Sequence, residues 1–465
     1  MESTADGGDD FLREHAQAAP VPGMVVLMQA AEPSVGTVAI TRAAAGVELG
    51  RGVPHGLFAE DAQVSRGHVR VSIEREATQN AGDAVSFRVE DLGSRNGTFL
   101  NGVRITGAVS QPAPGVLRIG RSLLWLVADV RPFTGQQKQV QAKEGPVLGG
   151  LTRRALGEIA IASKSGDTLL VVGESGSGKE GMARAFHETH FGPSSRAPFI
   201  AVNCAAIPEG LAERLLFGAK RGAFSGATDA DGYIVEAHGG TLFLDEVAEL
   251  DPLVQAKLLR VLETREVVAL GSVAPRKVQI RICAATHGDL RTAPSAGRFR
   301  ADLYYRVGRP EVRVPPLRER LDEIPYLLAR VCEGVSPQLQ AAVATVEACA
   351  LRHWPGNVRE LLSEARRAAH VAVAEGSDVL RPDHFAPEAG QPLAPGGSVS
   401  EAPAAAAPNP KSTAELDDGA IEAALAEHAG NVSRAAKALG LHRNQLRRWV
   451  AKHQPHTQPP EADEE

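Results

Sequence analysis

Two short segments in the middle of the chain carry residues that can handle a phosphate chain. Residues 173–180 read GESGSGKE and directly follow the apolar run LLVV. Backbone N–H groups of such a turn point at phosphates, and the helix that follows presents its positive end to them. Lys179 can reach the outer phosphates, whereas Glu180 stands where Ser or Thr is usual. A chance glycine turn is the alternative. The predicted phosphate loop consists of Gly173, Glu174, Ser175, Gly176, Ser177 and Gly178.

The second segment is an apolar run that ends in two carboxylates. Residues 241–246 read TLFLDE. Asp245 can hold Mg²⁺ through water, and Glu246 can polarise an attacking water. An acidic pair at a surface strand end is the plain alternative, but this pair follows a phosphate loop within one predicted α/β unit. Together the two segments predict a site for ATP and Mg²⁺.

The length of the chain, 465 residues, exceeds what one ordinary core holds, so we expect about three domains. Two stretches are typical of linkers. Residues 131–145 are polar and Gln-rich, and residues 387–412 are rich in Pro, Ala, Gly and Ser. The second stretch cannot bury enough apolar surface to offset the entropy of ordering it. The predicted folded units are 22–130, 146–386 and 413–455.

Composition limits the cellular compartment and the class of protein that the sequence can represent. A net charge of −6 argues against a chain that is basic throughout. The chain begins without the basic and apolar pattern of a secretion signal, and its apolar runs are far shorter than the ~20 residues of a membrane span. The cysteines form no C-x-x-C pair, which predicts buried thiols in a reducing compartment. We therefore expect a cytoplasmic protein without membrane contact. The cysteines are Cys204, Cys283, Cys332 and Cys349.

Hydrophobic patterning gives each unit a different fold class. The first unit has strand-like runs separated by turn signals, which indicates an all-β sandwich. The central unit alternates apolar strands with helical stretches, which indicates an α/β fold with a parallel sheet. Its last part, about 321–386, reads as helical, and so does the C-terminal unit. The strand-like runs of the first unit lie at 23–29, 36–42, 68–74, 85–91 and 116–120.

Seven ordered motifs in the central unit carry a family resemblance. Residues 147–386 resemble the AAA+ ATPase domain, with its helical lid, of sigma-54-dependent transcriptional activators, also called bacterial enhancer-binding proteins. One motif could arise by chance, but the series in this order is very specific. The motifs are GESGSGKE, NCAAIPE, LLFGAKRGAFSGA, GGTLFLDEV, FRADLYYRV, VPPLRER and WPGNVREL.

The resemblance also implies roles for residues outside the phosphate loop and the acidic strand end. Asn203 matches the asparagine that holds the catalytic glutamate until the nucleotide state changes. Arg300 and Arg306 match arginine fingers that reach the ATP of a neighbouring subunit, which implies a homo-oligomer, a hexamer when active. Arg359 matches the lid arginine that senses the γ-phosphate. Taken alone, each of these arginines could equally form an ordinary surface ion pair.

Three departures from the family pattern stand out. His287 occupies the position, usually Asn, that orients water near the γ-phosphate, so we expect altered rather than absent hydrolysis. The arm before the loop tip reads GAKR in place of the usual Gly-His-Glu-Lys. At the tip itself, Ser225 stands where Thr is usual.

The segment GAFSGA has no residue that can hydrolyse a bond, ligate a metal or read a base. The resemblance implies that it projects into the ring pore and contacts the sigma-54 subunit of the RNA polymerase holoenzyme. Glycines permit a tight tip, and the only large side chain is that of Phe224. A glycine-rich surface turn with Phe224 tucked into the core is the alternative. The predicted contact residues are Gly222, Ala223, Phe224, Ser225, Gly226 and Ala227.

A second ordered series, in the N-terminal unit, resembles the forkhead-associated (FHA) domain, which binds phosphothreonine peptides. The series is GRG at 50–52, SRGHVRV at 65–71 and DLGSRNGTFLNG at 91–102. A dianionic phosphate needs charged and hydroxyl donors that converge from separate loops. His68 and Asn101 are expected to brace the loops, and a degenerate domain that only dimerises is the alternative. The matching ligand contacts are Arg51, Ser65 and Arg66 for phosphate, and Arg95 and Asn96 for the peptide backbone.

The C-terminal unit has the pattern of a helix-turn-helix. Residues 431–453 contain six Lys or Arg and no Asp or Glu. A turn at Gly440 divides two helices, the basic one last, as in the Fis-type domain that this segment resembles. A basic amphipathic helix on a solvated surface is the alternative. Apolar side chains expected to pack are Ala435, Leu439, Leu441, Leu446 and Trp449. Residues expected to face DNA are His442, Arg443, Asn444, Gln445, Arg447 and Arg448.

The combined resemblances imply an ATP-dependent transcriptional activator. It would bind upstream DNA, recognise a phosphothreonine-containing protein, and remodel the closed complex of sigma-54 RNA polymerase at promoters. Two other classes compete with this interpretation. One is an AAA+ remodelling enzyme with a different client, and the other is a phosphopeptide-responsive DNA-binding repressor whose ATPase serves only oligomerisation.

Overall fold

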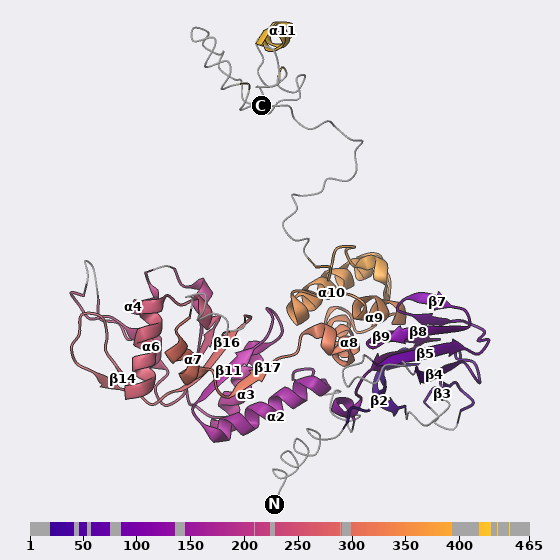
Figure 1. Cartoon of the computed structure of the whole chain (residues 1–465), viewed down its shortest axis with the longest axis horizontal. Helices are drawn as coiled ribbons and strands as arrows, with labels where there is room; N and C mark the ends of the chain where they lie inside the picture. Colours follow the sequence, from indigo (N-terminus) through magenta and orange to yellow (C-terminus); the bar gives the residue numbers. More distant parts are fainter. Residues whose placement is uncertain are drawn as a thin grey trace, which may run out of the picture. The chain divides into compact units, whose positions relative to one another are not determined.

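The computed structural model describes residues 19–40, 46–53, 57–74, 85–134, 145–208, 210–223, 228–288, 290, 299–392, 418–428, 435 and 446. The chain divides into two compact units, Met1–Leu393 and Ala394–Glu465 (Figure 1), and each is described by itself. Among the described residues, no helix has the length and apolar character needed to cross a bilayer.

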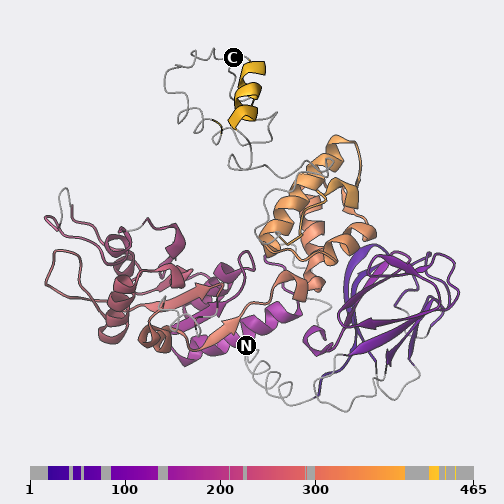
Figure 2. The same ribbon diagram turned by 45° about the horizontal axis from the view of Figure 1, so that its top comes forward.

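Two antiparallel sheets form the predicted sandwich at the start of the first unit (Figure 2). The sheets have the strand orders β2-β1-β10-β9-β6-β7 and β3-β4-β5-β8. Apolar side chains such as Met24, Phe87 and Leu124 fill the space between them. The strands are β1 Gly23–Gln29, β2 Glu32–Ala39, β3 Val47–Leu49, β4 Val69–Glu74, β5 Ser86–Asp91, β6 Thr98–Leu100, β7 Val103–Ile105, β8 Ala108–Pro112, β9 Gly115–Ile119 and β10 Ser122–Val127.

A five-stranded parallel sheet of order β12-β13-β16-β11-β17 forms the centre of the α/β part. Its apolar strands are buried by helices, as parallel sheets require. The strands are β11 Thr168–Val172, β12 Phe199–Asn203, β13 Thr241–Asp245, β16 Arg281–Thr286 and β17 Glu311–Arg313. The α-helices are α2 Gly150–Ser165, α3 Lys179–Phe191, α4 Ala212–Phe217, α5 Tyr233–Glu236, α6 Pro252–Thr264 and α7 Ala301–Val307. The short elements are η2 Cys204–Ala206, η3 Val247–Glu249, β14 Glu266–Val267 and β15 Arg276–Lys277.

A helical lid follows the sheet, as the sequence predicts. Its longest helix buries a stripe of alanines at the i, i+3, i+4, i+7 positions of one helix face, Ala365, Ala368, Ala369 and Ala372. Trp354 is fully buried just before that helix. The helices are α8 Ile324–Val335, α9 Val343–Ala350 and α10 Asn357–Ala374. The short elements are η4 Leu317–Glu319, η5 Leu321–Glu323, β18 Gln340–Ala341, β19 Val379–Leu380 and η6 Pro382–His384.

Both predicted linkers begin with residues that pack on the folded parts. A short 3-10 helix, η1 Arg131–Phe133, buries Phe133 edge-on against Trp125, with ring centroids 5.2 Å apart. At the other linker, Ala389 is buried and Gly390 lies against the ring of Trp354. The ordered structure thus reaches past the predicted starts of the linkers at 131 and 387.

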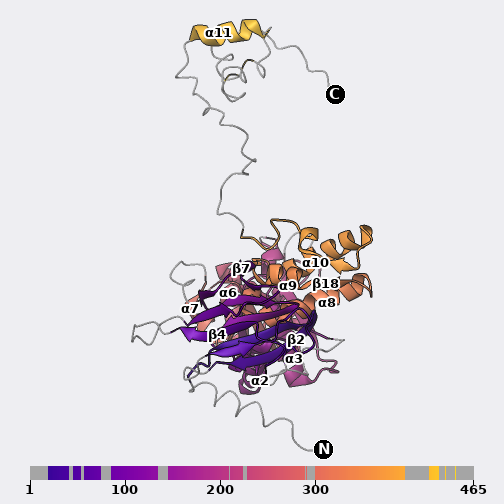
Figure 3. The same cartoon turned by 90° about the vertical axis from the view of Figure 1, so that its right-hand side faces the viewer.

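The C-terminal unit is described at α11, Asp418–Glu427 (Figure 3), and at two single positions. Ile421 and Leu425 of α11 are buried, and so are Ala435 and Leu446. The predicted packing of Ala435 and Leu446 is therefore confirmed. The remaining predicted core positions of this unit lie outside the described residues.

The cysteines agree with the expectation of buried thiols. Each is free and buried in the structure. The fold class agrees as well: a β-sandwich, then an α/β ATPase-type sheet with a helical lid, then a small helical unit.

Candidate functional site

The phosphate loop and the acidic pair meet because parallel strands end at one edge of the sheet. Strands β11, β16 and β13 are consecutive neighbours. The loop follows β11, His287 follows β16, and the carboxylates close β13. In an open α/β sheet this carboxyl edge is where ligands bind. A cavity of about 660 Å³ opens there, and its lining includes Glu174, Ser175, Glu246, His287, Arg318 and His353.

The phosphate loop has the backbone conformation that its glycines allow. Gly176 and Gly178 adopt φ of 73° and 105°, a region that residues with a Cβ rarely enter. Gly178 is the N-cap of α3, so the loop delivers the chain to the positive end of that helix. The hydroxyl of Ser177 is buried and has no hydrogen-bond partner among the described residues. A buried polar atom without a partner is costly, and a phosphate oxygen would satisfy it. These features fit a nucleotide phosphate chain.

Lys179 forms an ion pair with Glu246, which lines the cavity. The Lys179 ammonium, 7% exposed, donates to the Glu246 carboxylate at 3.0 Å and to the Gly173 carbonyl at 3.0 Å. Burial alone would raise the pKa of Glu246, but hydrogen bonds from His287 and Lys179 outweigh it and hold that pKa below its ordinary value. Glu246 is therefore ionised, as a group that polarises water must be.

The backbone at Glu246 adopts a left-handed conformation, with φ 52° and ψ 51°. Non-glycine residues in this region store strain, and such residues cluster at functional sites. The adjacent Asp245 has a raised pKa because of its burial, with the Lys179 charge opposing and the Glu246 charge adding to the rise. The Asp245 carboxylate also accepts a hydrogen bond from the Glu246 backbone N–H at 3.1 Å.

His287 takes a direct part in holding Glu246. Its Nδ1 lies 2.6 Å from one Glu246 oxygen, and its backbone N–H donates to the same oxygen at 3.2 Å. Asn203 acts elsewhere in this conformation. It caps η2, and its side-chain oxygen accepts from the Ala205 N–H at 3.0 Å. Among the described residues, no hydrogen bond joins Asn203 to Glu246. His287 therefore occupies the place that the resemblance implies for Asn203.

The lid contacts the phosphate loop at residues that sequence reasoning did not single out. Arg318 donates to both oxygens of Glu174, at 2.7 and 2.9 Å. Asn357, fully buried, donates to Glu174 at 3.1 Å and to the Ser175 carbonyl at 3.0 Å. Both residues lie in quoted motifs, VPPLRER and WPGNVREL, but only the fold brings them to the loop. The predicted lid residue Arg359 also contacts the loop, at the Ser175 hydroxyl, 3.4 Å away.

Three other predicted residues lie away from the cavity lining. Glu180 points along the surface of α3, where it pairs with Arg184 at 2.8 Å. Arg300, before α7, pairs with Asp302 at 2.7 Å. Arg306 is exposed and donates to the Leu262 carbonyl at 3.2 Å. Arg300 and Arg306 are thus at the surface, where a residue that serves a neighbouring subunit must be.

The predicted sigma-54 contact loop is described only at its base. Residues 224–227, which include Phe224 and Ser225, lie outside the described residues. Ala219 bridges to Ala230 and to Leu270, and the Lys220 N–H donates to the Leu270 carbonyl at 2.9 Å. Gly222 adopts φ 90°, as the resemblance implies for a tight tip. The base is therefore an ordered stem shared with the neighbouring segment around Leu270.

In the sandwich, the loops that carry the predicted peptide contacts are tied together. The Arg51 N–H donates to the Ser65 carbonyl at 2.9 Å, and the Ser65 hydroxyl accepts from the Arg95 N–H at 3.1 Å. The Ser65 hydroxyl keeps its own proton for a ligand. Asn96 donates to the Gln63 carbonyl at 2.7 Å, and Arg66 is exposed. The predicted contacts therefore lie on neighbouring loops, although the Arg51 Nε–H already donates to the Val64 carbonyl at 2.5 Å.

Three residues stabilise these loops by hydrogen bonds. His68 is fully buried and accepts from the Ser65 N–H at 3.0 Å, so its other nitrogen donates to the Gly97 carbonyl at 3.2 Å. Asn101 accepts from the Val116 N–H at 2.8 Å. The bracing roles expected for His68 and Asn101 agree with these contacts. Sequence reasoning missed Asp91, whose carboxylate accepts hydrogen bonds from Ser94 and Thr98.

Acidification is expected to loosen these loops through His68. Burial lowers the pKa of His68 from its ordinary value of 6.5, against opposing contributions from Gly97, Asp91 and Asp61. The unfolded chain therefore takes up the proton first, and the sandwich loses stability as pH falls from 6.5 toward the lowered pKa. Melting temperature measured between about pH 7.5 and 5.5 should show this fall.

His68→Asn is the matched control, because its amide oxygen can replace Nδ1 as acceptor without titrating. The variant should show a smaller fall over the same range. An identical fall in the variant and the wild-type protein would assign the pH dependence to other groups.

The predicted DNA-facing residues lie outside the described residues; they are His442, Arg443, Asn444, Gln445, Arg447 and Arg448. The structure describes no contact for them.

Comparison with known proteins assigns each part. Family models match an FHA domain at 47–122, a sigma-54 interaction domain at 150–313, an AAA+ ATPase lid domain at 318–399, and a bacterial regulatory protein domain of the Fis family at 413–453. The transcriptional regulatory protein ZraR of Klebsiella oxytoca is 40% identical over 304 residues, covering 63% of this chain and 65% of ZraR. The anaerobic nitric oxide reductase transcription regulator NorR of Aeromonas hydrophila subsp. hydrophila is 40% identical over 336 residues, covering 70% of this chain and 64% of NorR.

The matched part of the chain thus spans just under two thirds of the length of these relatives. Among solved structures, the crystal structure of NtrX from Brucella abortus in complex with ATP is 26% identical, with a TM-score of 0.47, covering 67% of this chain and 69% of NtrX.

The phosphate loop, the acidic strand end and the lid define an AAA+ ATPase domain. The chain carries an FHA domain, a sigma-54 interaction domain with its AAA+ lid, and a Fis-family domain in that order, and it is similar to transcriptional regulators such as ZraR and NorR.

Proposed function

We propose that this protein hydrolyses ATP to remodel sigma-54 RNA polymerase closed complexes at promoters, while bound to upstream DNA. The observation that carries the proposal is the ion pair between Lys179 and the cavity-lining Glu246, next to a phosphate loop whose buried Ser177 hydroxyl has no partner among the described residues. The sigma-54 interaction domain and the Fis-family domain support the choice of client and of DNA as partners. His442, Arg443, Asn444, Gln445, Arg447 and Arg448 are proposed to contact that DNA.

The chemistry follows from the contacts of Glu246. Lys179 pairs with Glu246 until a phosphate chain competes for the ammonium. Release of that oxygen would leave Glu246 free to polarise the attacking water, while His287 holds the other oxygen in place. Asp245, beside it, is the residue suited to hold Mg²⁺ through water, and that ion would neutralise charge on the phosphates. The altered partner His287 is expected to change the rate rather than abolish hydrolysis.

The experiment that tests the whole proposal is transcription in a purified system. ATP-dependent formation of open complexes with sigma-54 polymerase, on a template with an upstream binding site, is the expected result. Hydrolysis without open-complex formation would favour a different client. DNA binding that lowers transcription without need of hydrolysis would favour the repressor.

Arg300 and Arg306 are proposed to complete the site of a neighbouring subunit in a hexamer. Both are exposed, and neither lines the described cavity of its own chain. Specific ATPase activity should therefore rise with protein concentration, because each finger acts in trans. Arg306→Ala should lose activity at every concentration. An activity per subunit that stays constant down to monomer concentrations would contradict the assignment.

The FHA domain is proposed to recognise a phosphothreonine-containing protein. Arg51 and Ser65 come from adjacent loops, and the Ser65 hydroxyl can still donate. Arg51→Ala should weaken binding of a phosphothreonine peptide by about 10- to 150-fold, since a hydrogen bond to a charged group contributes about 1.5–3 kcal/mol.

Arg70→Ala is the control for that measurement, because Arg70 pairs with Glu48 and Glu90 on the same domain. It should leave peptide affinity unchanged in titration calorimetry. Equal affinity of the wild-type protein for phosphorylated and unphosphorylated peptides would rule out the sensing role.

A further inference from the structure

Two inner strands of the larger sheet of the FHA sandwich are buried on both faces. Strand β10 is buried at all six positions and β1 at six of seven. An antiparallel sandwich strand normally turns one face to water. Here that outer face meets the lid: α9 contacts β9 and β10, and α8 contacts β2. The sandwich and the lid are therefore joined through the outer face of these strands.

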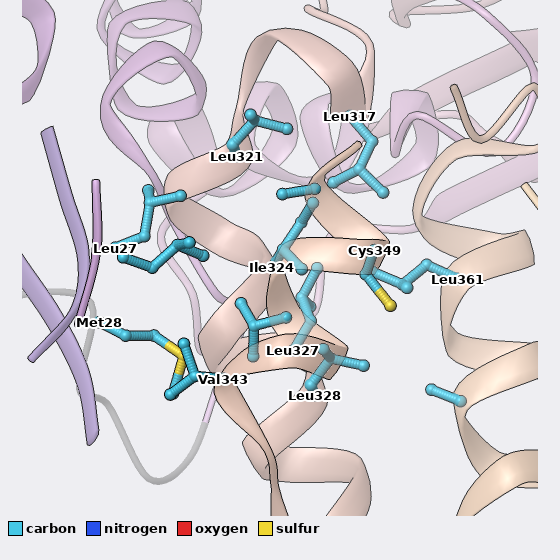
Figure 4. Packing of buried hydrophobic residues seen from close by; sticks show 14 of the residues in the cluster. Leu27, Met28, Leu317, Leu321, Ile324, Leu327, Leu328, Val343, Cys349 and Leu361 are labelled. Atoms are coloured by element: carbon cyan, nitrogen blue, oxygen red, sulfur yellow. The ribbon is translucent and has the colours of Figure 1, made fainter. Parts of the chain in front are cut away.

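One hydrophobic cluster runs through this junction. It joins Leu27 and Met28 of β1 to the lid residues Ile324, Leu327 and Val343 (Figure 4). All five side chains are buried. Separating the two domains would expose this surface to water, at a cost proportional to its apolar area. The FHA domain and the lid are thus expected to move as one body.

An ion pair also joins the sandwich to the lid. Arg118 of β9 donates to Glu347 of α9 at 2.6 Å, and Glu347 is 5% exposed. The Arg118 guanidinium also lies over the ring of Phe99, 3.8 Å from its centroid. Phe99 belongs to β6, which begins directly after the loop that carries Arg95 and Asn96. A rearrangement of that loop can therefore reach the Arg118–Glu347 pair through the short strand β6.

The other end of the lid holds the phosphate loop. Asn357 accepts from the Leu317 N–H at 2.8 Å while donating to the Ser175 carbonyl at 3.0 Å. A Cβ built at Gly176 would come within 2.2 Å of the Gly356 carbonyl oxygen, so lid backbone and loop backbone touch. Arg318 adds its pair of bonds to Glu174. A displacement of the lid must therefore change the loop that receives the nucleotide.

We propose that the FHA domain controls nucleotide affinity through the lid, with Arg118 and Glu347 as the positioning pair and Asn357 and Arg318 as the contact to the phosphate loop. The phosphopeptide arm of this regulation rests on the proposed recognition of phosphothreonine. The effect of the FHA–lid contact itself on nucleotide affinity, here called the docking arm, does not depend on that recognition. By linkage, a peptide that changes nucleotide affinity must have its own affinity changed by nucleotide by the same factor.

The docking arm is tested on the full chain with a fluorescent ADP derivative as probe. Arg118→Glu and Glu347→Arg each place like charges at the junction and should weaken ADP binding about fivefold or more, at the low end of measured couplings. The double variant restores the pair with reversed charges and should return to within about twofold of wild type. Arg70→Glu, which faces Glu48 and Glu90 within the sandwich, is the matched control and should not change ADP affinity.

Wild-type ADP affinity in both single variants would overturn the proposal, and so would a double variant that stays as weak as the singles. If the single variants with reversed charge fail to fold, ADP affinity is measured in Glu347→Gln instead, because this variant keeps the shape of the side chain. It should weaken ADP binding in the same direction, and an unchanged affinity would overturn the proposal.

The peptide arm uses a degenerate pool of phosphothreonine peptides and the matching threonine pool. In the wild-type protein the phosphorylated pool should shift ADP affinity, and in Glu347→Gln the pool should bind without causing the shift. A pool that binds the wild-type protein and shifts nothing overturns the coupling. A pool that does not bind contradicts the proposed phosphothreonine recognition instead, and leaves the docking result to stand by itself.

Discussion

Lys179→Ala is expected to abolish ATP hydrolysis, with a loss of at least about 100-fold in kcat/KM, the size seen when one preorganised charge contact is removed. The lysine is 7% exposed and donates to Glu246, which lines the cavity. Its removal takes the positive charge that the phosphates require. It also leaves Glu246 without one of the two partners that hold its pKa low. Both nucleotide binding and turnover should fall, measured by calorimetry and by phosphate release.

Glu246→Gln is the matched comparison, because it changes one atom at the other end of the same ion pair. Turnover should fall by about 10²- to 10⁴-fold, the range for loss of a general base. ATP affinity should be kept or rise, because Lys179 no longer has a carboxylate that competes with phosphate. A Glu246→Gln protein that binds ATP as poorly as Lys179→Ala would mean that Glu246 acts in binding rather than in chemistry.

The convergence of the catalytic groups was predictable from the sequence because each group lies next to a strand end. The loop after β11 and the carboxylates that end β13 are read directly from GESGSGKE and TLFLDE. Parallel strands bring their carboxyl ends to one edge, so local patterns alone bring Lys179 near Glu246. The same holds for the sandwich, where Arg51, Ser65 and Arg95 all belong to loops that the motifs define.

Partners that depend on the relative position of domains were not predictable. Asn357 lies 182 positions from Ser175, to which it donates. Arg118 lies 229 positions from Glu347. No periodicity relates such positions, and neither pair belongs to one secondary-structure unit. Sequence reasoning also did not predict His287 as the partner of Glu246, because His287 follows β16 and Glu246 follows β13, and only the folded sheet brings the two together.

One long-range contact did leave a signal. The run SLLWLV of β10 is apolar at five of six positions, whereas a strand with one wet face alternates. Strictly continuous apolar patterning in an antiparallel sandwich indicates a covered outer face. Phe133 packs on this covered face, edge-on against Trp125 of β10.

Phe224→Ala is expected to keep ATP hydrolysis but to lose promoter opening. The substitution removes the only large side chain of GAFSGA. The stem of this loop is held by backbone hydrogen bonds between Gly218, Lys220 and Leu270, which do not need that side chain. ATPase rate, DNA binding and melting temperature should therefore stay near wild type. Open-complex formation with sigma-54 polymerase, and binding of sigma-54 in a transition-state-like nucleotide complex, should be lost.

Ser225 supplies the matched pair of variants for that test. Ser225→Ala removes the only hydroxyl of the tip and should lose output in the same way, while Ser225→Thr keeps the hydroxyl, adds one methyl group, and should be tolerated. The core-packing alternative predicts a different pattern. A buried Phe224 replaced by Ala would cost about 3–5 kcal/mol of stability, so melting temperature, ATPase rate and open-complex yield would fall together. An unstable, inactive Phe224→Ala protein beside a fully active Ser225→Ala protein would establish that Phe224 packs in the core, because a force-transmitting tip needs both side chains and a core anchor needs only one.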